Sequence, residues 1–118
     1  MGDFNDEPHN LSLSKYLNCT DQLPLKIGQV YNSFIPLEKA GKGSVKFQTW
    51  DMFDQIMISE GLLENRSLHY KDYSKGILDP DWMHYKNVKT NAPFRTFQGS
   101  KYLGGYSDHF PVFIKLLY

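Results

Sequence analysis

The chain has 118 residues, with 13 basic and 13 acidic side chains and a formal net charge of zero. This length allows one domain, and the neutral balance excludes a polybasic nucleic-acid arm or an acidic tail, although not a nucleic-acid substrate. The single cysteine, Cys19, excludes an internal disulfide framework and a cysteine-rich zinc site. No apolar run approaches the roughly 20 residues of a membrane span and no targeting signal is visible, so the sequence leaves the localisation open.

The first third of the sequence predicts two short helices. Two acids and a proline at residues 6–8 are typical of a helix start, and the apolar spacing that follows predicts an imperfect amphipathic helix to about Asn18. Residues 20–24 break it. Residues 27–37 predict a second helix, and the glycine-rich residues 40–43 predict a loop. Cys19 is expected to be a small buried apolar side chain of the first helix.

The middle of the sequence predicts a β-hairpin. Residues 45–50 alternate apolar and polar side chains, which is the period of a half-buried strand. Residues 53–59 predict a second strand, and residues 51–52 are compatible with a tight turn between the two.

The last half of the sequence is less regular. Residues 61–90 are ambiguous, with a short strand predicted at 68–70 and one helical turn at 82–85. The composition of residues 92–105 predicts a long loop. Residues 110–118 predict an apolar strand, with a proline near its start, that is covered on both faces.

Polar side chains stand next to predicted strands at three places. These are Asp3 with Asn5, which project to the same side if the segment is extended, then Asp54, and then the Ser-Asp-His triplet that ends at His109. Each also has a structural reading, as a turn, a loop cap or a solvated strand end. It is less expected that all three features are purely structural at once than that any one of them is, because all three fall at strand ends or faces of one small domain.

Asp54 is the sharpest single feature, because an ionised carboxylate in an apolar strand requires a hydrogen-bonded partner. His109 is a natural candidate. A carboxylate paired with an imidazole fixes the tautomer and raises the basicity of the ring. Such a pair suits general acid–base chemistry near neutral pH.

Three motifs together resemble a known family. They are Gly-Asp-Phe-Asn at residues 2–5, Asp-Gln-Ile-x-x-Ser at residues 54–59 after Trp50, and Ser-Asp-His-Phe-Pro-Val at residues 107–112. Their order and sequence are similar to those of the C-terminal half of the endonuclease/exonuclease/phosphatase family, and most similar to its bacterial members. The resemblance implies an α/β fold, namely the C-terminal half of a two-sheet sandwich of the deoxyribonuclease I-like type, with residues 1–118 as a single fragment of that domain.

The same resemblance implies Mg²⁺- or Mn²⁺-dependent hydrolysis of phosphodiesters or phosphomonoesters and gives each motif residue a role. Asp3 matches the aspartate that prepares the water, and Asn5 matches the asparagine that binds the phosphate oxygens. Asp54 matches the aspartate that pairs with the catalytic histidine, here His109. Asp108 matches the aspartate near the metal ion. These assignments suit in-line attack on phosphorus, which spreads charge over oxygens that a metal and hydrogen-bond donors can hold.

The chain also departs from the family pattern. The early glutamate that is the family's principal Mg²⁺ ligand has no counterpart here, because Glu7, Glu38 and the later glutamates lie in the wrong order. We therefore expect a fragment of a longer enzyme, weak or inactive alone, with little metal binding of its own. Its expected partners are a missing N-terminal half or a second copy that pairs through the exposed strand edge at residues 112–116.

Other residues give weaker signals. Arg95 could contact a substrate phosphate, although a solvated loop explains it slightly better. Trp50 could stack on a substrate ring, although core or rim packing explains it equally well. His9, His69 and His84 show no metal-ligand spacing and are treated as surface residues.

Two classes of function remain after this reading. The first is a phosphoesterase fragment, whose substrate class the sequence leaves open. The alternative is a non-catalytic, self-associating module that binds without turnover. A nucleic-acid-binding module has little support, because no basic stripe or helix-turn-helix pattern is visible.

Overall fold

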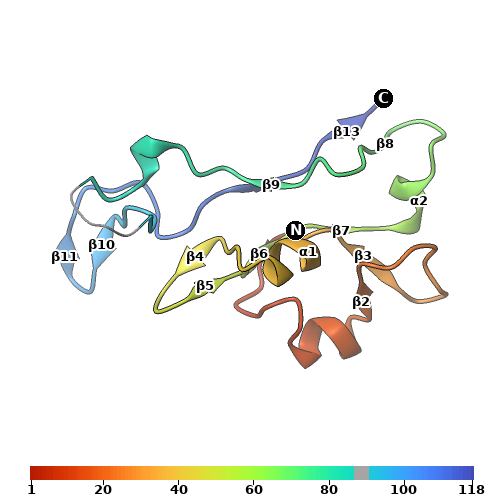
Figure 1. Ribbon diagram of the computed structural model, residues 1–118, viewed down its shortest axis with the longest axis horizontal. Helices are drawn as coiled ribbons and strands as arrows, with labels where there is room; N and C mark the ends of the chain where they lie inside the picture. Colours follow the sequence, from red (N-terminus) through yellow and green to blue (C-terminus); the bar gives the residue numbers. More distant parts are fainter. Residues whose placement is uncertain (87–90) are drawn as a thin grey trace.

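Short strands dominate the computed structural model, which describes residues 1–86 and 91–118 and has few helices (Figure 1). The ambiguous stretch 61–90 ends in residues 87–90, which lie outside the described residues. The helical elements are η1 (Ser12–Tyr16), α1 (Ile35–Lys39), α2 (Glu60–Leu63) and the 3-10 turn η2 (Asp81–Met83).

The strands of the described residues pair into small sheets rather than one continuous sheet. In chain order they are β1 (Gly2–Asp3), β2 (Cys19–Thr20), β3 (Val30–Asn32), β4 (Val45–Lys46), β5 (Trp50–Asp51), β6 (Asp54–Gln55), β7 (Met57–Ile58), β8 (His69–Tyr70), β9 (Gly76–Ile77), β10 (Phe97–Gln98), β11 (Lys101–Tyr102), β12 (Val112–Phe113) and β13 (Leu116–Leu117). The pairs are β1–β6, β4–β5, β8–β13, β9–β12 and β10–β11, and β3 lies between β2 and β7. Only β2–β3 is parallel among these pairings.

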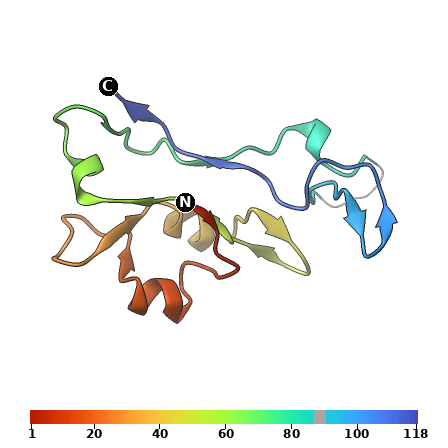
Figure 2. The same cartoon turned by 180° about the vertical axis from the view of Figure 1, so that it is seen from behind.

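The elements form two arms that α2 connects. In both views the paired strands β9–β12 and β8–β13 run along one side, and the elements from β1 to β7 lie on the other (Figures 1 and 2). The hairpin β10–β11 projects at one end. The radius of gyration is 15.9 Å, against about 13.5 Å for a compact domain of this length, so the molecule is elongated.

The hydrophobic core holds the two arms together. Its buried centre consists of Phe34, Met52 and Ile56. Half-buried side chains from both arms pack against this centre, namely Leu37, Ile77, Val112 and Ile114. The burial of this apolar surface fixes the last strands, and hence the segment before them, against the first arm.

The predicted first helix forms over only part of its length. Only Ser12–Tyr16 is helical, and residues 6–8 lie in a loop. The reason is local: the Asp6 carboxylate accepts hydrogen bonds from the side chains of Asn10 and Ser12, which competes with a regular helical start. Cys19 is buried as expected, but it lies in β2 rather than in a helix.

The predicted second helix is also wrong over most of its length. Residues Val30–Asn32 form β3, and the helix α1 begins only at Ile35, with Pro36 in its first turn, where proline is tolerated. The buried Asn32 side chain explains the change. Its carbonyl oxygen accepts the N–H of Phe34, and its amide donates to the side chain of Gln55 at 2.7 Å.

The predicted hairpin between residues 45–50 and 53–59 does not form. Instead β4 pairs with β5, which spans the end of the first segment and the start of the predicted turn, with Val45 opposite Asp51. The strand β6 pairs with β1, which lies at the start of the sequence. A local pattern does not reveal a pairing between strands about 50 residues apart, because the alternation of apolar and polar side chains indicates a strand but not which strand it pairs with.

The last third has more strand pairing than expected. The predicted loop 92–105 contains the hairpin β10–β11, which turns at Gly99 with a φ of +60°. The predicted strand 110–118 is two pieces that pair with β9 and β8. It is not covered on both faces, because Phe113, Leu116 and Leu117 are exposed. The short strand at 68–70 is confirmed as β8, and the turn at 82–85 is shifted to η2.

Among the described residues, none of the helices has the length and hydrophobicity needed to cross a membrane.

Candidate functional site

The pairing of β1 with β6 brings two carboxylates together. Asp3 and Asp54 are direct partners in this antiparallel pair. The next position is hydrogen-bonded, with the N–H of Phe4 donating to the carbonyl of Phe53 at 2.9 Å. Side chains that stand opposite each other on one face of such a pair are close neighbours, so the register sets the two carboxylates side by side.

His109 reaches this site from the far end of the sequence. It forms an antiparallel bridge with Val45, and the N–H of Phe110 donates to the carbonyl of Ser44 at 2.7 Å. The N–H of His109 donates to the Ser107 hydroxyl at 3.1 Å. The segment that carries His109 is therefore held at the edge of β4, beside β6.

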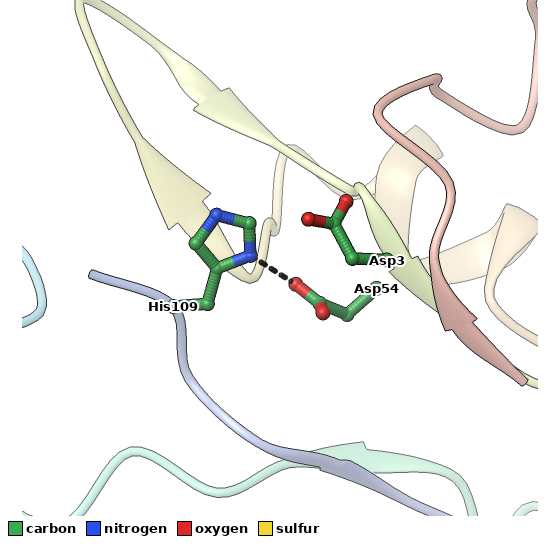
Figure 3. Close-up of side chains that lie close together, drawn as sticks. All are labelled: Asp3, Asp54 and His109. Atoms are coloured by element: carbon green, nitrogen blue, oxygen red, sulfur yellow. Dashed lines mark hydrogen bonds and ion pairs between the residues drawn. The ribbon is translucent and has the colours of Figure 1, made fainter. Parts of the chain in front are cut away.

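Asp3, Asp54 and His109 converge in one cluster (Figure 3). The Nδ1–H of His109 donates to Oδ2 of Asp54 at 2.7 Å. One ligand atom from each of the three side chains lies within 4.8 Å of the others. The side chains of His109 and Asp54 are 22% and 19% exposed, so the pair is shielded but open to solvent. The predicted Asp54–His109 pair is confirmed.

The arrangement has two chemical capacities. The bond to Asp54 fixes the His109 tautomer, so that Nε2, which points away from Asp54 in Figure 3, can accept or donate a proton. The neighbouring carboxylates supply hard oxygen donors for a cation.

Asn5 leaves the strand instead of continuing it. Its φ is +50°, in the left-handed region, and its N–H donates to Oδ1 of Asp3 at 2.9 Å. The expectation of an extended segment is therefore wrong beyond Phe4. The sharp turn nevertheless keeps Asn5 next to Asp3 and at the surface.

Asp108 is exposed and directly precedes His109. It is not one of the three donors that converge in the cluster, and its assignment as a metal ligand stays a prediction.

Trp50 and Arg95, the other two residues predicted to bind substrate, both pack against aromatic rings. Trp50 stacks on Phe110 with 5.9 Å between ring centroids. The Arg95 guanidinium lies 5.5 Å from the centre of the Phe47 ring. Neither belongs to the carboxylate–imidazole cluster, so a substrate role for either residue stays a prediction.

Ser44 and Gln55 support the site, and sequence reasoning missed both. The fully buried Ser44 hydroxyl accepts the N–H of Asp54 at 3.1 Å, while its carbonyl holds Phe110. Gln55, also fully buried, donates to the carbonyls of Asp6 and Met52. A buried glutamine inside the motif around Asp54 was a usable signal, whereas nothing around Ser44 distinguished it from a loop serine.

The cavity next to this region does not coincide with the cluster. It has a volume of about 390 Å³ and is lined by Trp50, Phe110 and His84, among others, but not by Asp3, Asp54 or His109. The converging groups of Asp3, Asp54 and His109, rather than this cavity, form the candidate site, because their ligand atoms lie within 4.8 Å of one another.

Comparison with known proteins gives one family match. A family model described as the Endonuclease/Exonuclease/phosphatase family matches residues 1–117. No match to the chain was found among the curated proteins or among the solved structures.

Proposed function

The chain belongs to the endonuclease/exonuclease/phosphatase family of phosphoesterase- and nuclease-type hydrolases, and we propose from this that it contributes the cluster of Asp3, Asp54 and His109 to Mg²⁺-dependent hydrolysis of phosphate esters. The observation that carries the proposal is the 2.7 Å bond between His109 and Asp54 beside Asp3. Three segments far apart in the sequence converge there.

The donor set fits a hard divalent cation. The Asp3 carboxylate stands in the cluster, and Asp108, next to His109, adds a further carboxylate to the proposed ligands. Asp54 is engaged with His109, and imidazole is a poor ligand for Mg²⁺. Mg²⁺, or Mn²⁺ with the same preference for oxygen, supplies neutralisation of the phosphoryl oxygens when bound.

The proposed roles of the protein groups follow from their positions. Asp54 orients the His109 ring, and Nε2 of His109 holds or transfers a proton at the phosphate. Asp3, whose Oδ1 already accepts the N–H of Asn5, orients the attacking water with its second oxygen. The side-chain amide of Asn5 donates to a phosphate oxygen.

Two further residues belong to the proposed substrate contacts. The Arg95 guanidinium, held over the Phe47 ring, supplies positive charge for a phosphate. Trp50, half-buried against Phe110, offers a ring for stacking.

We also propose that the chain is part of a deoxyribonuclease I-like sandwich and that it has low activity by itself. The small separate sheets and the radius of gyration of 15.9 Å favour a chain that further strands complete into a deoxyribonuclease I-like sandwich. The cluster also offers only one carboxylate, Asp3, that is not already bonded to His109. We therefore expect weak Mg²⁺ binding and slow turnover.

The test is hydrolysis of bis(p-nitrophenyl) phosphate by the full chain with and without Mg²⁺. We expect EDTA to abolish turnover and His109→Ala to lower it by roughly 10²- to 10⁴-fold, the usual contribution of a central acid or base. His69→Ala, which alters a histidine whose ring is hydrogen-bonded to the carbonyl of Ser67, is the matched control. Near-normal turnover by His109→Ala overturns the assignment.

A second candidate function is a non-catalytic module that self-associates. The exposed apolar side chains of Phe113, Leu116 and Leu117 on β12 and β13 favour it. A folded sample without turnover that light scattering shows to be a dimer supports this candidate, and a monomer that hydrolyses the ester excludes it.

A further inference from the structure

A second cluster of ligand-type side chains lies outside the proposed hydrolytic site. Glu7, His9 and Glu38 each offer one ligand atom, and the three atoms lie within 4.8 Å of one another. Nδ1 of His9 is 3.3 Å from Oε2 of Glu7 and in direct hydrogen-bond contact with Oε1 of Glu38. The spacing of the histidines alone gave no sign of it, because Glu38 is 29 residues after His9 and comes from α1.

The fold holds the two carboxylates in place. Oε1 of Glu7 accepts the N–H of the core residue Met52 at 3.2 Å, which leaves Oε2 for His9. Pro8, between Glu7 and His9, is buried. The side chains of Glu7 and Glu38 are only 20% and 15% exposed, whereas that of His9 is 67% exposed. The carboxylates are preformed, and the imidazole covers them from the solvent side.

One imidazole proton cannot form a good hydrogen bond to both carboxylates. Nδ1 carries one hydrogen, and that hydrogen is directed to Glu38, so the Oε2 atom of Glu7 at 3.3 Å shares it poorly. A cation between the three atoms would compensate both carboxylates and use the Nδ1 lone pair at the same time.

The separation of His9 from Glu7 suits a transition metal, whereas His9 and Glu38, which are in direct hydrogen-bond contact, must move apart when the ion enters. A tetrahedral ion with bonds of about 2.0–2.1 Å holds its ligands about 3.3 Å apart, which is the distance between His9 and Glu7. One imidazole and two carboxylates are ligands that Zn²⁺ accepts, whereas Mg²⁺ prefers oxygen alone. The three side chains also line a cavity of about 580 Å³, which leaves room for water as a fourth ligand.

We propose that Glu7, His9 and Glu38 form a binding site for Zn²⁺ or a similar divalent transition metal, distinct from the cluster of Asp3, Asp54 and His109. The site joins the N-terminal loop to α1. It is independent of the proposed hydrolysis and does not require it.

The test is calorimetric titration of the full chain with ZnCl₂, with NMR of the histidine ring protons as a second readout. We expect a Zn²⁺ site that perturbs the ring of His9, and a rise in the unfolding temperature with Zn²⁺. His9→Ala and Glu38→Gln should weaken this site by more than the roughly 10- to 100-fold that loss of an outer-shell partner costs. Because His9 is largely exposed, His9→Ala should fold normally, and circular dichroism checks this.

Two controls separate this site from others. His69→Ala removes another histidine, and His109→Ala removes the histidine of the proposed hydrolytic site, and both should keep the Zn²⁺ site. A His9→Ala titration that superimposes on that of the wild type overturns the proposal. So does a wild-type chain without measurable Zn²⁺ binding, or Zn²⁺ binding that only His109→Ala removes.

Discussion

Asp3 and Asp54 face each other across a non-hydrogen-bonded position of the β1–β6 pair. The neighbouring pair, Phe4 and Phe53, is hydrogen-bonded, and the two types of position alternate in an antiparallel ladder. Side chains approach most closely at the non-hydrogen-bonded positions, and like charges placed there oppose folding. Two acids at such a position are therefore costly to the fold, which is typical of residues retained for a function.

Replacing Asp3 by Asn should separate stability from activity. The amide oxygen can still accept the N–H of Asn5, but the repulsion from Asp54 is removed. In EDTA, we expect a stability gain of about 0.2–1 kcal/mol by urea unfolding, together with a loss of ester hydrolysis. Asp72→Asn, at an exposed position, is the control and should change neither quantity. A loss of stability in Asp3→Asn would contradict this account.

Ser44→Ala should weaken both the fold and the site. The variant removes the acceptor for the half-buried N–H of Asp54, and an unsatisfied group of this kind costs about 1–2 kcal/mol. Urea unfolding measures the loss, and hydrolysis by the same sample should fall because Asp54 is no longer held against His109. Ser100→Ala, at an exposed turn, should be neutral. Equal stability of the two variants would show that the bond to Asp54 contributes nothing.

Gln55→Leu should be among the more destabilising substitutions. It removes the acceptor of Asn32 and the donor to the carbonyls of Asp6 and Met52, all within the buried or half-buried interior. We expect a loss of about 2–4 kcal/mol, because these partners lose their bonds without regaining water. The matched variant Gln48→Leu, at an exposed position, should stay within about 0.5 kcal/mol of the wild type. A loss below 1 kcal/mol for Gln55→Leu would be the contrary result.

Two glycine-to-alanine substitutions should have opposite effects. A Cβ at Gly105 would lie 2.0 Å from the carbonyl oxygen of Phe94 and 2.4 Å from that of Arg95, and backbone atoms cannot move aside cheaply. We expect Gly105→Ala to cost about 1–3 kcal/mol or more. At Gly61, in α2, nothing lies within 4 Å, so alanine should stabilise the chain by up to about 1 kcal/mol. Thermal unfolding of both variants tests the difference in sign.

The ion pair between Lys39 and Asp21 should make stability depend on acid pH. The hydrogen bond from Lys39, at 2.8 Å, and that from Gln22 lower the pKa of Asp21 below 3.8. The folded state therefore gains stability from this group above its ordinary pKa, and loses it as the pH falls through the lowered value.

Lys39→Ala should accordingly cost a few tenths to about 1 kcal/mol at neutral pH, since the Lys39 side chain is 65% exposed. The difference from the wild type should shrink at acid pH, as the Asp21 carboxyl takes up a proton below its lowered pKa. Urea unfolding at the two pH values measures it, with Lys26→Ala as the control. A difference that persists at low pH would mean that Lys39 acts through packing rather than charge.

The chemistry of the site was more predictable than its scaffold. An acid in an apolar strand requires a partner, and this requirement made His109 a candidate partner of Asp54, which the structure confirms. The motif order pointed to the family, which the match over residues 1–117 confirms. The position of Asn5 was predicted less well, because its left-handed backbone is set by the bond to Asp3 and not by the strand pattern.

The strand pairings were the least predictable feature. Alternation in residues 45–50 and 53–59 predicted two strands but not that β6 would pair with β1 instead of with its neighbour. The helix predicted at residues 27–37 failed for a related reason, because the buried bond between Asn32 and Gln55 outweighs local helical spacing. Partners distant in sequence decided both outcomes.

The site depends on contacts between residues far apart in the sequence. Asp3 pairs with Asp54, and His109 bonds to Asp54, so these separations also determine when the site forms during folding. Each contact closes a loop of about 50 residues. Such non-local contacts form slowly and late, because the chain loses conformational entropy before the contact contributes any stabilising free energy. The cluster should thus assemble only in the final stage of folding, after the last strands dock. A nascent chain whose residue 109 has not left the ribosome would hold both carboxylates and still be chemically silent.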